Sequence, residues 1–275
     1  MSAENSNGLT NGHWDWQLGN GLRTLVSMAP VCALCRANGD LLNSHIIPEF
    51  FYRLVYDPKP RRFHVISAIA SEPEYYEQKG LRERLLCKDC EQKLGRWENY
   101  AKQAFVDGRA LQITQQKDGV VLSNLDYKPF KLFLLSLLWR MSVSKLDFFK
   151  EVRLGPYEEK IRLALINEDP LQPEQCACSM VVVQLSGKTY SDWIVEPTLA
   201  RVGGRHVYSL VITGILFNFH VGEQPLHQSI KTQVLNERGE MAVPVMEMRD
   251  IPFLIRFARR FAQARDARRK SRSKA

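Results

Sequence analysis

Two CxxC pairs constrain this chain more than any other feature of its sequence. Cys32 and Cys35 form the first pair, and Cys87 and Cys90 form the second. Two residues between thiolates allow a tight turn to direct both sulfur atoms at one ion, and two such turns complete a tetrahedral zinc site. The alternative, four buried thiols that share this spacing by coincidence, stays open. We expect a structural zinc ion, because a closed four-cysteine site leaves no open position for chemistry.

The rest of the composition describes an ordinary folded protein. The 275 residues are 45% hydrophobic and 25% charged, which suits one large domain or two modest ones. The start of the chain is polar, and the longest apolar runs, Leu132–Trp139 and Leu210–Val221, are shorter than the roughly 20 residues that span a membrane. We therefore expect a cytoplasmic protein without a membrane span. Thiols stay reduced there, so its cysteines are metal ligands or packing residues sooner than disulfides.

The pattern along the chain predicts an α+β fold. The middle of the chain is helical, because the apolar run from Phe130 to Trp139 is too long and continuous for a typical strand. Strands follow it, rich in Val, Ile, Tyr and Phe and separated by glycine-containing turns. They are expected at Met180–Leu185, Trp193–Glu196, Val207–Val221 and Lys231–Leu235.

Five segments follow from these patterns. They are a polar N-terminal arm (1–25), a zinc-bound module (26–125), a helical segment (126–170), an antiparallel β-rich domain (171–249), and a basic amphipathic helix and tail (250–275).

The segment between the cysteine pairs carries the first chemical signal. It reads Ser44-His45-Ile46-Ile47-Pro48, and the second cysteine pair runs into a predicted helix. A four-cysteine framework, a histidine after a short strand, and a final CxxC that opens a helix together resemble the His-Me (HNH) endonuclease superfamily. The branch braced by two CxxC pairs, as in phage resolvases, is the most similar. The resemblance implies a zinc-stapled ββα module within residues 26–125.

The resemblance also implies roles for single residues. His45 matches the general base that activates water against a phosphodiester. In the family an acidic residue just before that histidine and an Asn just after the last cysteine hold one Mg²⁺ or Mn²⁺; here Ser44 and Glu91 stand at those positions. The family's final histidine is missing, since Asn99 lies where it is expected. For His45, a structural role in which its ring hydrogen-bonds the backbone stays open as well.

The predicted helix offers a further carboxylate. If it begins near Asp89, then Glu91, Gly95 and Glu98 share one face. Glu98 is thus a candidate second acidic residue, and Gly95 leaves room for a phosphate. The ordinary alternative is that Glu98 is a solvated residue of a helix surface.

The resemblance extends to Leu85–Glu91 and Ser136–Arg140, segments that look like those of a group of bacterial proteins with a degenerate HNH-like module. Arg140 either places a guanidinium near the active site or closes its helix at the favourable C-terminal end. Cys176 and Cys178 form a CxC beside prolines, which is more typical of loop thiols than of a ligand pair.

The positive charge of the chain is concentrated at its end. Residues 250–275 hold nine Lys/Arg and two Asp, so +7 of the net +8 lies there. This cluster is a candidate foothold for a nucleic-acid backbone, DNA more than RNA, with an anionic membrane or an acidic protein partner as rivals. The candidate nucleic-acid-binding residues are Arg256, Arg259, Arg260, Arg265, Arg268, Arg269 and Lys270.

These features together favour a metal-dependent endonuclease of the HNH type, with one structural zinc and one catalytic Mg²⁺ or Mn²⁺. A role in bacterial defence follows only by analogy. The alternative is a catalytically inactive zinc-finger protein that binds nucleic acid or a protein partner. A third possibility is that the β-rich half senses a ligand and gates the nuclease half.

Overall fold

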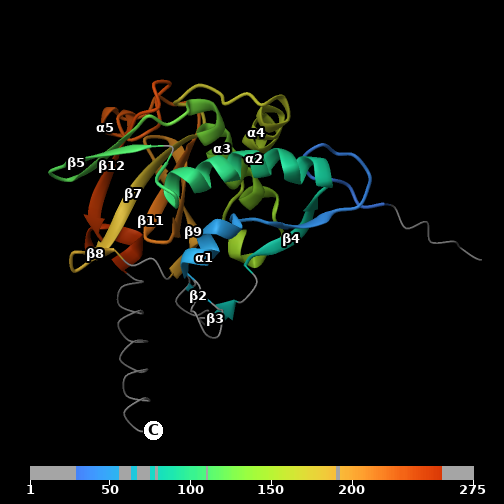
Figure 1. The fold of residues 1–275 in the computed structure, drawn as a ribbon, viewed down its shortest axis with the longest axis horizontal. Helices are drawn as coiled ribbons and strands as arrows, with labels where there is room; N and C mark the ends of the chain where they lie inside the picture. The colour runs from blue at the N-terminus through green and yellow to red at the C-terminus, as the bar shows by residue number, and fades with distance from the viewer. Residues whose placement is uncertain are drawn as a thin grey trace, which may run out of the picture.

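The structure of the chain is α+β, as the sequence predicted. The computed structural model describes residues 29–55, 63–66, 75–77, 80–109, 111–189 and 193–255, with the backbone alone for 63–66 and 75–77 (Figure 1). In this part of the chain no helix is both long and apolar enough to cross a membrane.

The cysteine-bearing segment forms a small sheet and a helix. Strand β1 (Leu42–His45) pairs antiparallel with β4 (Arg82–Leu86), and α2 (Lys88–Phe105) begins directly after Cys87. The first turn of α2 carries acidic residues, which suit the positive end of the helix dipole. Between the two strands, α1 (Glu49–Val55) starts just after Pro48. The helix that we expected near residue 89 is therefore confirmed.

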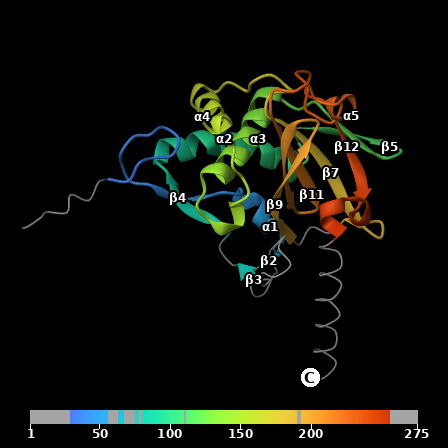
Figure 2. The same ribbon diagram turned by 180° about the vertical axis from the view of Figure 1, so that it is seen from behind.

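A second, larger sheet crosses the molecule (Figure 2). Its hydrogen-bonded order is β3-β2-β9-β10-β11-β7-β12-β6-β5, with β8 paired to β7. Its pairs are antiparallel except β2 with β9 and β7 with β12. The strands are β2 (Phe63–Ile66), β3 (Tyr75–Glu77), β5 (Gln112–Gln116), β6 (Gly119–Ser123), β7 (Ala177–Leu185), β8 (Lys188–Thr189), β9 (Trp193–Val202), β10 (Arg205–Ile212), β11 (Ile215–Val221) and β12 (Met241–Glu247).

The long apolar run at residues 207–221 is a hairpin. Strands β10 and β11 pair up to Ile212 and Ile215, and the two residues between them, Thr213 and Gly214, both have positive φ. Two residues of positive φ suit the twist of a tight hairpin.

Helix α3 (Tyr127–Val143) is the centre of the core. Every residue from Phe130 to Ser142 is buried, and α3 contacts both α2 and α4 (Pro156–Asn167). Figures 1 and 2 show these three helices together beside the large sheet. The helical middle predicted from the sequence is thus confirmed. Shorter helical turns are η1 (Asp147–Phe149), α5 (Gln228–Lys231) and η2 (Met248–Asp250).

An aromatic cluster joins the cysteine-bearing segment to the large sheet. The ring of Phe51 on α1 lies 6.0 Å from that of Phe217 on β11, and the ring of Phe105 on α2 lies 6.2 Å from the same Phe217. Phe130 of α3 packs on Phe105 at 5.6 Å. Aromatic pairs at these separations bury large apolar areas. One continuous core therefore holds α1, α2 and α3 against the sheet.

One predicted strand is wrong. Residues 231–235 do not form a strand; α5 ends at Lys231, and a single bridge joins Val234 to Ser179. His227 caps α5 by accepting from Ser229 N–H, which starts a helical turn instead. Val234 and Leu235 are nevertheless buried and belong to the hydrophobic core clusters of the protein. The predicted terminal helix begins at 252–255, and its remainder lies outside the described residues.

Candidate functional site

The four cysteines of the two CxxC pairs meet in one cluster. Their sulfur atoms all lie within 4.8 Å of one another, and Cys35 Sγ lies 3.7 Å from Cys87 Sγ. Zinc with Zn–S bonds of about 2.3 Å holds tetrahedral sulfur ligands roughly 3.8 Å apart. The four cysteines therefore lie close enough to bind a metal such as zinc, as the sequence predicted.

Strand pairing brings these two distant pairs together. The pairing of β1 with β4 closes the long insertion, and Ala33 N–H donates to the carbonyl of Leu85 over 3.0 Å. This places the first turn of cysteines against the start of α2. The four-cysteine cluster thus lies at one end of the small sheet.

The thiols of the cluster differ in how readily they lose a proton. Burial alone would raise the pKa of Cys32, but backbone N–H donors, Cys87 N–H at 3.3 Å among them, hold it at about 7. Burial and the neighbouring thiols raise the pKa of Cys90 well above its usual range. A bound metal stabilises the thiolate form of every ligand, so with a metal all four cysteines could be deprotonated together.

His45 ends β1 and faces a carboxylate. Its Nε2 lies 2.7 Å from Glu49 Oε2 in the first turn of α1, and its side chain is 18% exposed. Burial and the charges of Arg82 and Arg140, opposed by Glu49, together lower the pKa of His45 to about 4. The ring is therefore neutral at neutral pH. The 2.7 Å separation from Glu49 Oε2 has the length of an ion-pair contact, while the buried Nε2 completes no hydrogen bond with the described residues.

Ser44 and Glu91 touch each other beside this histidine. The Ser44 hydroxyl donates to Glu91 Oε2 over 2.6 Å. Ser44 is fully buried at the end of β1, and Glu91 lies in the first turn of α2. Strand and helix therefore bring together the two residues that the sequence analysis placed at metal-ligand positions.

Glu98 binds a buried arginine. Its Oε1 lies 2.5 Å from Nη1 of Arg140, a side chain that is 1% exposed. The same Nη1 donates to the backbone carbonyl of His45 over 2.8 Å. Glu98 is thus neither a solvated helix residue nor a free second carboxylate. Of the two readings of Arg140, the structure places its guanidinium next to His45.

The surroundings of His45 hold spare hydrogen-bond donors. Arg140 Nη2 and Arg82 Nε are buried, and no described residue accepts a hydrogen bond from either atom. Arg82 lies opposite His45 in the strand pair and 3.5 Å from Glu49. Buried donors without acceptors are costly, so this corner of the molecule has unused capacity for an oxygen-rich anion.

The helix face between the acidic residues is open. A Cβ atom built on Gly95 would meet no atom within 4 Å, which agrees with the space that the sequence analysis expected there. Among the described residues, the four cysteines form the one group of three or more His, Cys, Asp or Glu side chains compact enough to hold a metal. A metal ion bound near His45 would therefore have fewer protein ligands than a metal ion bound by the four cysteines.

Sequence reasoning did not name two residues of this site. Glu49 lies four residues after His45, and that spacing at a helix start was a usable signal. Arg82 reaches His45 through strand pairing across a long insertion, for which the sequence carries no local signal.

The other candidates lie elsewhere. Cys176 and Cys178 are buried at the start of β7 and belong to no metal-compatible group of the described chain. His220 is buried and within 3.0 Å of the Ser179 hydroxyl, while His206 lies 3.2 Å from Arg201. The arginine-rich set from Arg256 to Lys270 lies outside the described residues.

No family model, curated protein or solved structure matches the chain.

Proposed function

We propose that the chain is a metal-dependent endonuclease, with the catalytic centre at the end of β1 and a structural zinc in the cysteine cluster. One observation carries the proposal: the neutral, partly exposed His45 follows a serine that contacts Glu91 at 2.6 Å. The sequence resemblance to the HNH family assigns these three residues to the positions of the base and the metal ligands. The β1–β4–α2 arrangement supports a ββα module of that type.

In this proposal His45 is the general base. A base that works near neutral pH needs a free lone pair, and Glu49, 2.7 Å from Nε2, would favour the tautomer in which Nδ1 takes a proton from water. Glu49 acts as a positioning residue, because it fixes the tautomer and stabilises the imidazolium formed by proton transfer. Positioned general bases contribute about 10²- to 10⁴-fold to rates.

Ser44 and Glu91 would hold the catalytic Mg²⁺ or Mn²⁺. Their oxygens are adjacent, and magnesium is commonly bound by one or two carboxylates together with substrate phosphates. Such an ion supplies charge stabilisation at the leaving oxygen. Glu91 provides the carboxylate that Ser44 does not, so the residues present fit one weakly held ion.

Arg140 and Arg82 would receive the phosphate. Arg140 is anchored by Glu98 and by the carbonyl of His45, which leaves its Nη2 as a buried donor beside the base. A guanidinium suits phosphate oxygens. Nucleic acid, DNA sooner than RNA, is the proposed substrate. It contains the phosphodiester to be cleaved, and its anionic backbone would bind the basic residues near the C-terminus.

The test is a cleavage assay on plasmid DNA, single-stranded DNA and RNA with Mg²⁺ or Mn²⁺. We expect metal-dependent nicking by the wild type and a loss of at least about 100-fold in His45→Ala. Zinc content and circular dichroism should not change in that variant. His206→Ala, which removes an exposed histidine, is the matched control and should cut like the wild type. No cleavage of any substrate by the zinc-loaded wild type would contradict the proposal.

A catalytically inactive zinc-braced binding module is the second candidate. The observation that favours it is the hydroxyl of Ser44, which stands where the family has an acidic ligand and leaves Glu91 as the one carboxylate in contact there. This candidate predicts that the protein binds DNA or a protein partner with an affinity that falls as salt rises. His45→Ala should leave that affinity unchanged, and neither the wild type nor any variant should cleave nucleic acid. A role in bacterial defence accords with either candidate by analogy alone.

A further inference from the structure

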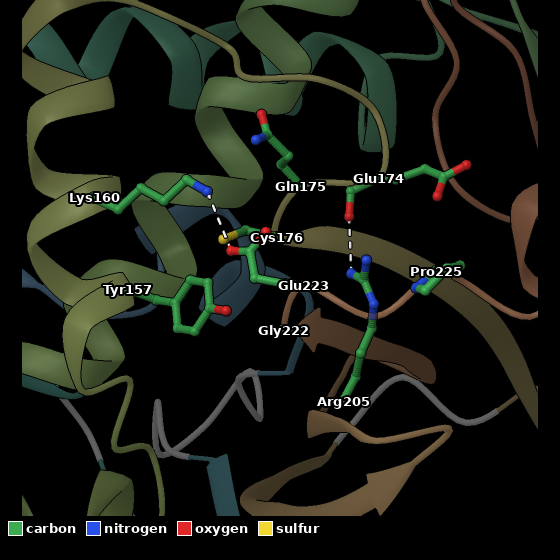
Figure 3. A pocket seen from close by; sticks show the side chains of 9 residues that line it. All are labelled: Tyr157, Lys160, Glu174, Gln175, Cys176, Arg205, Gly222, Glu223 and Pro225. Atoms are coloured by element: carbon green, nitrogen blue, oxygen red, sulfur yellow. Dashed lines mark hydrogen bonds and ion pairs between the residues drawn. The ribbon is translucent and has the colours of Figure 1, made fainter.

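A separate pocket lies where α4 meets the ends of β10 and β11. Its volume is about 260 Å³. Tyr157 and Lys160 of α4 line one side, and Cys176, Arg205 and Glu223 line the other (Figure 3). None of these residues has a part in the nuclease proposal.

Arg205 brings a buried positive charge to this pocket. Its side chain is 5% exposed and donates to backbone carbonyls only, those of Gln224, Glu174 (2.9 Å) and His220 (3.4 Å). No described carboxylate pairs with it. A buried guanidinium that meets only neutral acceptors keeps its charge uncompensated.

A second buried cation lies behind the pocket wall. Lys131 of α3 is 2% exposed, and its ammonium donates to the carbonyls of Pro173, Gln175 and Cys176. Burial, with a contribution from the charge of Arg205, lowers the pKa of Lys131 to about 8. The ammonium of Lys131 and the guanidinium of Arg205 therefore repel each other, and a negative charge in the pocket would stabilise both.

Of the two carboxylates that line the pocket, that of Glu174 pairs with Lys231 at 2.9 Å, and the other belongs to Glu223. Its Oε1 lies 3.5 Å from Lys160 Nζ, and the two side chains are 71% and 35% exposed. Figure 3 shows the Glu223 carboxylate paired with Lys160, with the hydroxyl of Tyr157 on the same side. An exposed pair of this kind contributes little stability, so a stronger anion can displace Glu223 from Lys160.

Gly222 permits the close packing at the pocket floor. A Cβ atom built there would lie 3.0 Å from Arg205 Cγ and 3.1 Å from Gln224 Oε1. Its φ of 153° also lies where side chains are disfavoured. The glycine thus lets the chain after β11 pass directly over the arginine.

We propose that this pocket binds a phosphoryl group, with Lys160, Arg205 and the Tyr157 hydroxyl as its ligands. Arginine matches the planar spread of phosphate oxygens, and lysine adds a mobile point charge. The volume admits inorganic phosphate or a small phosphate monoester and excludes a nucleic-acid strand. Binding here is independent of cleavage at His45.

The test uses calorimetric titration of the full chain with inorganic phosphate and, separately, with glycerol 3-phosphate, at constant ionic strength. Lys160→Gln should weaken phosphate binding at least fivefold, and Glu223→Gln should tighten it about threefold or more because the competing carboxylate is gone. Lys188→Gln, which removes an exposed lysine of β8, is the matched control and should bind like the wild type. Both pocket variants alter an exposed pair, so they should fold normally.

The two probes separate the source of the phosphoryl group. Tighter binding of glycerol 3-phosphate supports an ester as the natural ligand, and equal binding supports free phosphate. The proposal is overturned if phosphate does not bind, if Lys160→Gln and Lys188→Gln bind it equally, or if acetate binds as tightly as phosphate.

Discussion

Glu98→Gln should destabilise the protein far more than its position on a helix surface suggests. Arg140 is 1% exposed and ties α3 to α2 through Glu98 Oε1, and to β1 through the carbonyl of His45. Loss of one partner from a buried ion pair costs roughly 3–5 kcal/mol, because the other charge stays buried without compensation. Glu98 itself is 23% exposed, so the low end, about 3 kcal/mol, applies.

Urea denaturation of purified variants measures this effect. A loss of about 3 kcal/mol corresponds to a fall in Tm of roughly 6–12 °C for a chain of this size. Glu151→Gln, at an exposed glutamate, is the control and should stay within about 0.5 kcal/mol of the wild type. The double variant Glu98→Gln/Arg140→Met should recover much of the loss, since it leaves no buried charge. If Glu98→Gln matched the Glu151 control, the buried ion pair would not stabilise this site.

Three further predictions concern the scaffold. Cys87→Ser should lower the zinc content below one ion per chain and lower Tm, and atomic emission with thermal denaturation checks both. Gly239→Ala should lower the free energy of unfolding by at least about 3 kcal/mol, because its Cβ would lie 1.8 Å from the Leu125 carbonyl oxygen at φ +78°. Gly203→Ala, where a Cβ meets open space, should lower it by about 1 kcal/mol. Equal losses in the two variants would contradict the clash. Burial, with the charge of Arg205, lowers the pKa of His220 to about 4, so below pH 6.5 the unfolded chain binds a proton that the folded chain does not. The free energy of unfolding should therefore fall by up to about 1.4 kcal/mol per pH unit as pH drops from 6.5 toward 4. His220→Gln should remove that part of the slope in urea titrations, and an unchanged slope would refute the assignment.

Local patterns predicted much of the fold. The CxxC spacing, the helix after Cys87 and the buried run around Phe133 depend on short-range chemistry, and each is found. The strand predicted at 231–235 is wrong because residues buried in the core outside a strand have the same apolar composition as a strand.

The site was harder to predict because its contacts are long-range. The contacts of Arg140 with Glu98 and with the His45 backbone join α3 to α2 and β1. The local sequence of each element does not predict these contacts. The same holds for Arg82 opposite His45. The position of Ser44 against Glu91 was anticipated only through the family resemblance.

The most direct test of the nuclease account is chemical rescue of the base. Single-turnover cleavage by His45→Ala is measured with and without added imidazole, at zinc content equal to that of the wild type. The account predicts a rate at least about 100-fold below the wild type and a saturable recovery as imidazole fills the space of the missing ring. Cleavage by His45→Ala at the wild-type rate would contradict it.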